Sequence, residues 1–161
     1  MTLDQPIHCY YLGESYMLKM HHDPSAKKPQ IDFDGKSLKL TSPNSGQIAI
    51  EPLLQSYYTK VLKKLISERI AFFQSEFKVK PKGFVIEDSK LRWGSCNSDR
   101  HLTFNWRLAM LHIEVIDYVI VHEMCHLVHL NHDRSFWRLV GKILPDYKTT
   151  MAYLGNSKRS S

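Results

Sequence analysis

The stretch His122-Glu123-Met124-Cys125-His126 limits the choice of fold more than any other, because its residue types and spacing suit a helix that binds a metal ion. Residues four apart lie on one face of a helix, so His122 and His126 can present two imidazole nitrogens to one ion. Glu123 lies beside them, where its carboxylate can take a proton from a metal-activated water. The preceding segment, 115–121, is strongly apolar, and buried unpaired histidines would be costly there. The motif therefore predicts a buried helix with a hydrolytic metal site, in preference to ordinary polar histidines on an amphipathic helix.

A catalytic zinc site usually has three protein ligands and a water, so a third side chain is needed. His129 falls on the same helical face as His122 but roughly 10 Å farther along the axis, too far for tetrahedral ligation of one ion. We expect it to flank the site or to act as a donor behind a ligand. His132 is favoured, because Asn131 can end the helix in a left-handed conformation and Asp133 can cap a new helix. The expected ligands of one Zn²⁺ per chain, a site that other divalent transition metals could also occupy, are His122, His126 and His132.

The rest of the chain predicts an α+β fold. Short strands forming a β meander are expected at Ile7–Leu12, Tyr16–Met20, Ile31–Phe33, Lys36–Leu40 and Gln47–Ile50. A long helix runs from Pro52 to about Phe77. Three further strands, of which the last two form a hairpin, are expected at Gly83–Glu87, Lys90–Ser95 and His101–Asn105. The last helices are expected at Ile113–Leu130, Asp133–Leu144 and Asp146–Gly155.

These elements predict one domain over residues 1–155, with a β-rich part at 1–50, a core at 51–155 and a disordered tail at 156–161. With 161 residues, of which 43% are hydrophobic, the chain can build a core without disulfides. Cys9, Cys96 and Cys125 form no disulfide or metal-knot pattern, and Cys125 is expected to pack in the core. No apolar run could span a bilayer and no signal-peptide pattern opens the chain, so we expect a cytoplasmic protein with no membrane partner.

The net charge is +6, with an isoelectric point near 9.2. This excess of basic over acidic residues is compatible with binding to a polyanion such as nucleic acid. The basic residues are scattered along the chain, however, as on a solvated surface, and no interleaved aromatic and basic motif accompanies them. Nucleic-acid binding is therefore not favoured.

Several motifs together resemble those of the YgjP-like metal-dependent hydrolases. They are Leu91–Cys96, Asn105–Leu108, Val115–Val119, His122–His126, Asn131-His132 and Phe136-Trp137. Members of this family are similar to SprT-like and other zincin peptidases, in which a helix carries His-Glu-x-x-His beside a small sheet and a later histidine completes the site. The resemblance implies a zincin-like fold with a small sheet or hairpin packed on the metal helix. It also implies metal ligation by His122, His126 and His132, with Glu123 as general base.

The same resemblance implies that the strand around Gly94 borders the cleft and pairs with an extended peptide. Gly94 would then let the peptide backbone approach closely. Trp93 and Trp106 are expected to pack in the core and not to contact substrate. Arg92 and Asn105 are the polar residues that we expect as neighbours of the site.

Three functions fit these features. The favoured one is a zinc-dependent metallopeptidase acting on a peptide or protein, with Tyr118, Tyr147 or His129 as candidates to stabilise the oxyanion. The first alternative is a metal-dependent nucleotide pyrophosphatase that hydrolyses nucleoside triphosphates, although no glycine-rich phosphate cradle is present. The second is a non-enzymatic, zinc-stabilised module that binds nucleic acid or protein. The presence of Glu123 argues against it, because a purely structural zinc site does not need that carboxylate.

Overall fold

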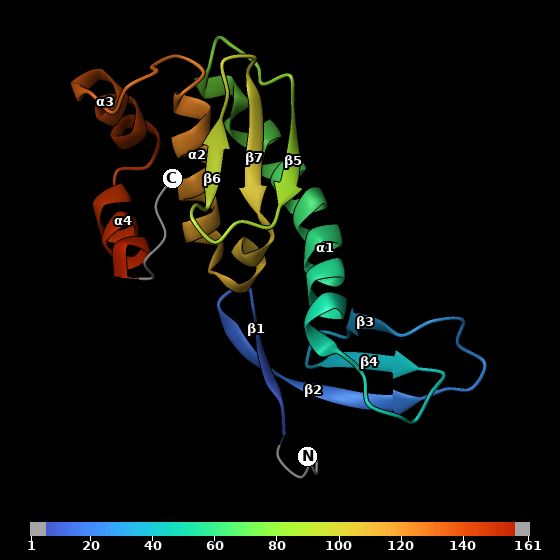
Figure 1. The fold of residues 1–161 in the computed structure, drawn as a ribbon. Coiled ribbons are helices and arrows are strands. Elements are labelled where there is room, and N and C mark those ends of the chain that lie inside the picture. Colours follow the sequence, from blue (N-terminus) through green and yellow to red (C-terminus); the bar gives the residue numbers. More distant parts are fainter. Residues whose placement is uncertain (1–5, 157–161) are drawn as a thin grey trace.

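The computed structural model describes residues 6–156 of the chain and arranges them as a small N-terminal sheet, a long helix and a larger α+β body (Figure 1). Four α-helices and two sheets lie within these residues. Apart from Asn156, which ends the last helix, the expected disordered tail at 156–161 lies outside the described residues. The body carries the predicted metal helix, so the functional site belongs to it.

The N-terminal sheet contains four strands, but their order departs from the expected meander. The strands are β1 (His8–Tyr11), β2 (Glu14–His22), β3 (Gln30–Phe33) and β4 (Leu38–Ser42). Their order is β1-β2-β4-β3, and β2 pairs with β4 in parallel. Leu38 and Leu40 in β4 are fully buried, whereas Gln30 and Asp32 in β3 are exposed. The more apolar strand β4 thus lies between β2 and β3. The long connection at 23–29 lets the chain place β3 at the edge before β4 returns beside β2.

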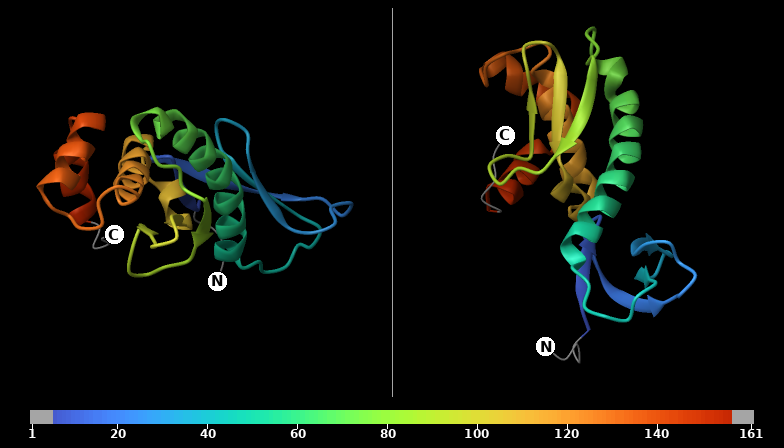
Figure 2. Two further views of the ribbon diagram at one scale, coloured as in Figure 1. Left: turned by 90° about the horizontal axis from the view of Figure 1, so that it is seen from above. Right: turned by 45° about the vertical axis from the view of Figure 1, so that its right-hand side comes forward.

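The prediction of a fifth strand at Gln47–Ile50 is wrong. Residues 47–49 have no regular structure and Ile50 begins helix α1 (Ile50–Phe73). Ile48 and Ile50 pack against the core of the N-terminal sheet, so their alternation reflects packing at the entry to the helix. A 3₁₀ turn, η1 (Gln74–Glu76), follows α1, close to the predicted end near Phe77. Helix α1 joins the N-terminal sheet to the body (Figure 2).

The second sheet has the order β5-β7-β6, which leaves β6 at one edge. Its strands are β5 (Gly83–Glu87), β6 (Gly94–Cys96) and β7 (His101–Asn105). Strands β6 and β7 form the predicted antiparallel hairpin, while β5 runs parallel to β7. The predicted strand Lys90–Ser95 is shorter than expected, because residues 88–93 form a loop.

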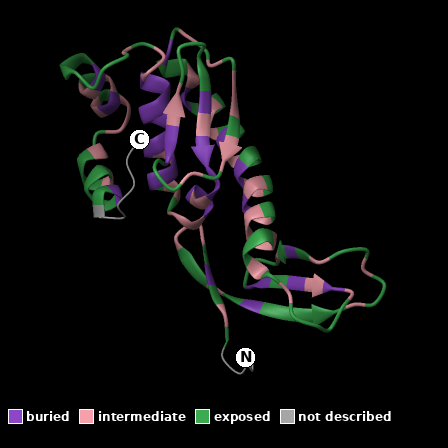
Figure 3. Cartoon of the chain, in the orientation of Figure 1, coloured by how far each residue is buried: buried purple, intermediate pink, exposed green. Residues whose placement is uncertain are grey.

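The remaining helices follow a 3₁₀ turn, η2 (Trp106–Met110), and surround the body's core. They are α2 (Ile113–Cys125), α3 (Arg134–Ile143) and α4 (Tyr147–Asn156). Helix α2 is the most deeply buried, as Figure 3 shows. The Arg69 guanidinium donates to both carboxylate oxygens of Asp117, at 2.7 and 2.8 Å, and so ties α1 to α2. No helix within residues 6–156 is long and apolar enough to cross a bilayer.

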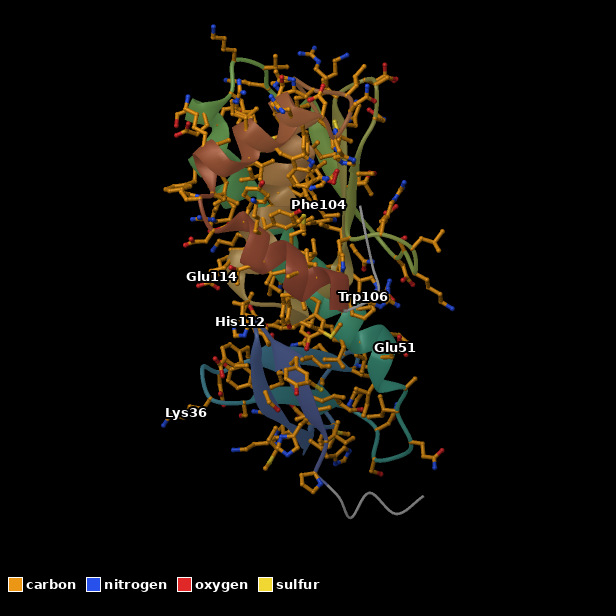
Figure 4. The ribbon with its side chains drawn as sticks, turned by 90° about the vertical axis from the view of Figure 1, so that its left-hand side faces the viewer. Lys36, Glu51, Phe104, Trp106, His112 and Glu114 are labelled. Atoms are coloured by element: carbon orange, nitrogen blue, oxygen red, sulfur yellow. The ribbon has the colours of Figure 1, made fainter. Side chains whose placement is uncertain are left out.

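The turn between β1 and β2 joins the N-terminal sheet to the body. The backbone N–H groups of Leu12 and Gly13 donate to the carbonyls of Ala109 and Met110, at 2.8 and 3.1 Å. Figure 4 shows His112 at this boundary. Gly13 has φ +85°, and a Cβ there would lie 2.1 Å from Nδ1 of His112. The joint therefore requires glycine for both its backbone conformation and its close contact.

We expect Gly13→Ala to lower the free energy of unfolding by about 3 kcal/mol, because alanine adds a clash to the strain of a left-handed backbone. The matched control is Gly35→Ala, where φ is +95° but nothing lies within 4 Å of the added Cβ. It should cost about 1 kcal/mol, from strain alone. Urea denaturation of both variants measures the difference, and equal losses would show that the joint with His112 contributes nothing.

Candidate metal centre

Helix α2 ends earlier than the sequence predicts, and this early end positions the third histidine. His126 is the C-cap, and the backbone N–H groups of residues 126–128 each donate to the carbonyl three residues back. Tight turns thus replace the expected helix to Leu130. Asn131 is not left-handed either, since the only non-glycine residues of 6–156 with positive φ are Leu12 and Arg100. The chain instead reverses through residues 126–133 and carries His132 back over α2.

Three imidazole rings converge where the sequence predicts a metal site. Nε2 of His132 lies 3.1 Å from Nε2 of His122 and 3.0 Å from Nε2 of His126. Tetrahedral zinc with Zn–N bonds of 2.0–2.1 Å would separate its ligand nitrogens by about 3.3 Å. These histidines form the only group of three or more potential metal ligands found in residues 6–156. The spacing therefore fits one small cation between the three nitrogens.

In His122 and His126, the nitrogen that faces away from the metal site, Nδ1, has a hydrogen-bond partner. Nδ1 of His126 donates to the backbone carbonyl of His129 at 3.0 Å, which leaves its Nε2 unprotonated. Nδ1 of His122 lies 3.3 Å from the hydroxyl of Tyr118 and can donate to that oxygen in the same way. His129 thus contributes its carbonyl oxygen to the site and is absent from the cluster of potential ligands. Sequence reasoning missed these contacts, although Tyr118, one turn before His122, is the signal that could have indicated one of them.

An aromatic wall from α3 packs against the imidazoles. The Phe136 ring lies 4.6–5.0 Å from all three histidine rings, measured between centroids. Trp137 stacks on His132 at 5.8 Å. Asp133 caps α3 as predicted, by accepting from the backbone N–H of Phe136 at 3.0 Å. The cap fixes the start of α3, and α3 in turn holds the rings in their converging positions.

Burial sets the protonation of the site. It lowers the pKa of His122 to about 3, aided by the neighbouring imidazoles of His126 and His132, and it also lowers the pKa of His126. Neutral imidazoles are the form that binds metals. Burial raises the pKa of the Glu123 carboxyl to about 8, against the opposing charge of Arg92. Oε2 of Glu123 is buried without a hydrogen-bond partner, so a cation with its bound water would satisfy both the carboxylate and the facing nitrogens.

A cleft of about 280 Å³ opens beside the histidines. The residues that line it include Arg92, Ser95, Cys96, Glu123, His126 and Leu130. The expected site neighbour Arg92 therefore lies in the cleft, where Glu87 holds its guanidinium at 3.0 Å.

The other expected neighbour, Asn105, is fully buried and is not among the residues that line this cleft. Its amide donates to the carbonyls of Ser89 and Arg92, at 2.6 and 3.0 Å, and so anchors the loop that presents Arg92. Trp93 and Trp106 are buried in the core, as expected.

Gly94 is required for the packing of β6 on α2. A Cβ there would lie 3.1 Å from Cγ of Glu123 and 3.2 Å from Cγ1 of Val119. The sequence predicted a close approach by a substrate backbone, whereas the close neighbour in the structure is the metal helix. Gly94 therefore brings the edge strand against Glu123.

The candidates for oxyanion stabilisation do not line the cleft. The Tyr118 hydroxyl is behind His122, and burial raises the pKa of that tyrosine to about 12. Tyr147 stacks on Trp137 at 5.5 Å. Cys125 is buried in the core, as expected, and all three cysteines are free thiols.

Comparisons with known proteins agree with this geometry. A model described as the YgjP-like, metallopeptidase domain matches residues 2–157. The metallopeptidase zymogen of Pyrococcus abyssi abylysin is a similar solved structure, 20% identical, with a TM-score of 0.54. The match covers 59% of this chain and 97% of that one. A search of curated proteins found no match. The likeness in structure confirms the expected zincin-type α+β fold.

We expect Tyr118→Phe to weaken zinc binding about tenfold, because His122 loses the oxygen that orients its ring. The matched control is Tyr147→Phe, since no hydrogen bond of the Tyr147 hydroxyl is found in residues 6–156. Competition with a coloured chelator measures both affinities. Equal affinities in the two variants would contradict a supporting role for Tyr118.

Proposed function

The chain belongs to the YgjP-like metallopeptidase family and is therefore a metal-dependent hydrolase, and we propose that it is a zinc peptidase with Glu123 as its general base. We assign His122, His126 and His132 as the zinc ligands. One observation carries this proposal: three imidazole nitrogens face one another beside a buried oxygen of the Glu123 carboxyl group that has no hydrogen-bond partner. A bound cation would be coordinated by the nitrogens and would stabilise the ionised carboxylate, and together the two features match a hydrolytic zinc site.

Zinc, when bound, polarises a carbonyl and lowers the pKa of bound water to about 7. Glu123 then takes the proton from the attacking water and passes it to the leaving amine. Contact with Gly94 fixes the Glu123 side chain against β6, so the carboxylate stays at the wall of the cleft. Its burial removes competing water, which strengthens each electrostatic contact that it makes.

The edge strand β6 supplies a place for an extended peptide. Because the sheet order puts β7 on only one side of β6, the other side can hydrogen-bond to a substrate backbone. Gly94, Ser95 and Cys96 all line the cleft that contains Glu123 and His126. A peptide added to this edge would therefore pass directly over the proposed zinc site.

Nucleotide hydrolysis has less support. Among the described residues that line the cleft, Arg92 is the one Lys or Arg side chain, and Glu87 already pairs with it. A triphosphate carries several negative charges and would need more cationic partners than this. A purely structural zinc site would leave the burial of Glu123 unexplained.

We expect Glu123→Gln to keep its zinc and lose at least about a hundredfold in kcat on peptides, because the amide cannot accept the proton. The matched control is Glu114→Gln, an exposed position in the first turn of α2 that should leave kcat unchanged. Zinc content and cleavage of casein and a peptide library are measured for both variants. Nucleoside triphosphates form a parallel set of substrates.

Peptide cleavage that survives in Glu123→Gln would reject Glu123 as the base. Phosphate release from nucleotides that is lost in Glu123→Gln, with no peptide cleavage by the parent protein, would replace the peptidase by a pyrophosphatase.

A further inference from the structure

Three lysines follow one another at alternate positions between η1 and β5. Lys78, Lys80 and Lys82 are exposed, whereas Phe77 is buried and residues 79 and 81 are partly buried. The segment is a loop that bends at residues 78, 79 and 82 before β5 begins. This segment crosses the end of the second sheet, at the top of the body in Figure 1. It therefore presents a row of ammonium groups to solvent.

The row of lysines is fixed in place. The side-chain amide of Gln74 donates to the carbonyls of Phe77 and Val79, at 3.3 and 3.1 Å, which clamps the inner side of the segment. The backbone N–H of Lys82 donates to the carbonyl of Arg100 at 2.8 Å. Arg100 thereby adds a fourth cation from the turn between β6 and β7. We call this surface, Lys78, Lys80, Lys82 and Arg100, the cationic ridge.

The ridge makes no ion pair within residues 6–156, although exposed Glu76 and Asp99 lie near it in the sequence. The ion pairs found in residues 6–156 are Arg69–Asp117, Arg92–Glu87 and Arg107–Asp88, and none involves the ridge. Residues 1–50 contain five lysines and five carboxylates, so the net charge of +6 arises wholly from the later residues. Several cations without an ion-pair partner in one exposed patch favour an anionic partner through electrostatic complementarity.

The ridge adjoins the catalytic cleft. Asn97 and Ser98 line the cleft, and the backbone N–H of Arg100 donates to the carbonyl of Asn97 at 3.1 Å within the same turn. A peptide that lies along the free edge of β6 and continues past Cys96 reaches this turn. If the peptide then crosses the end of the sheet, it meets Arg100 before β7 and Lys82 before β5.

We propose that the cationic ridge is an exosite for an acidic stretch of the polypeptide substrate, several carboxylates of which would bind to the ridge. The four exposed cations lie in one loop and the neighbouring turn, so several carboxylates of one peptide can reach them together. Single-stranded nucleic acid fits less well, because the ridge offers no exposed aromatic ring on which bases could stack. The proposal names a substrate class for the proposed peptidase and so rests on that function.

The test measures peptide binding without turnover, using the zinc-loaded Glu123→Gln protein and fluorescence anisotropy. Two labelled peptides share one neutral segment, followed either by alternating Glu residues or by Gln at the same positions. We expect the acidic peptide to bind about tenfold more tightly, and high salt to remove this advantage. Because no cleavage is required, a failure of the peptidase assignment leaves this result interpretable.

Two triple variants with the same change in charge locate the effect. The ridge variant combines Lys78→Gln, Lys80→Gln and Lys82→Gln, and it should bind both peptides equally. The control on the exposed face of α1 combines Lys60→Gln, Lys63→Gln and Lys64→Gln, and it should keep the preference.

Three results would overturn the exosite. The parent protein binds both peptides alike, the control variant loses as much preference as the ridge variant, or an oligonucleotide of equal charge displaces the acidic peptide more effectively than unlabelled acidic peptide does. The first of these, combined with cleavage of neutral peptides, would reject the exosite and leave the peptidase intact.

Discussion

The convergence of three imidazole rings, with Nε2 of His132 at 3.1 and 3.0 Å from those of His122 and His126, is the constraint on which the site depends. Three polar nitrogens that face one another need either protons or a cation between them, and packing of the surrounding side chains holds the rings in this arrangement. Helix α2 fixes two of them because it is buried on nearly every side. The third, His132, depends on the early end of α2 and on Phe136, whose ring touches all three imidazoles. Metal binding and the packing of α3 are therefore expected to stabilise each other.

Strand β6 forms the wall of the cleft beside Glu123, and it does so through a close contact with α2. Gly94 lets β6 approach α2 until its backbone lies against Glu123, and the same strand keeps its outer edge available for a peptide. Asn105 holds the preceding loop through two carbonyls and so determines where Arg92 enters the cleft. The proposed base, the proposed metal ligands and the substrate edge thus belong to one packed unit, to which α1 and the turn at Gly13 join the N-terminal sheet.

The sequence predicted what depends on local chemistry. The spacing of His122 and His126, the cap at Asp133 and the strands ending at Glu87 and Asn105 all follow from residue types a few positions apart. The order of the N-terminal strands was not predictable in this way, because tertiary packing decides which strands pair with each other. The start of α1 at Ile50 was missed because the alternating residues Ile48 and Ile50 pack against the sheet's core without forming a strand. The hydrogen bond from His126 to the carbonyl of His129 was missed because the helix was expected to continue to Leu130, whereas it ends at Cys125 in a series of tight turns.

The most direct test of this account is the zinc content of two alanine variants, His132→Ala and His129→Ala, after dialysis against a weak chelator. In the structure His132 presents Nε2 to the other two ligands, whereas His129 contributes only its backbone carbonyl. The account predicts one zinc per chain in His129→Ala and little or none in His132→Ala. Full zinc in His132→Ala, or its loss in His129→Ala alone, would contradict the assignment of the ligands.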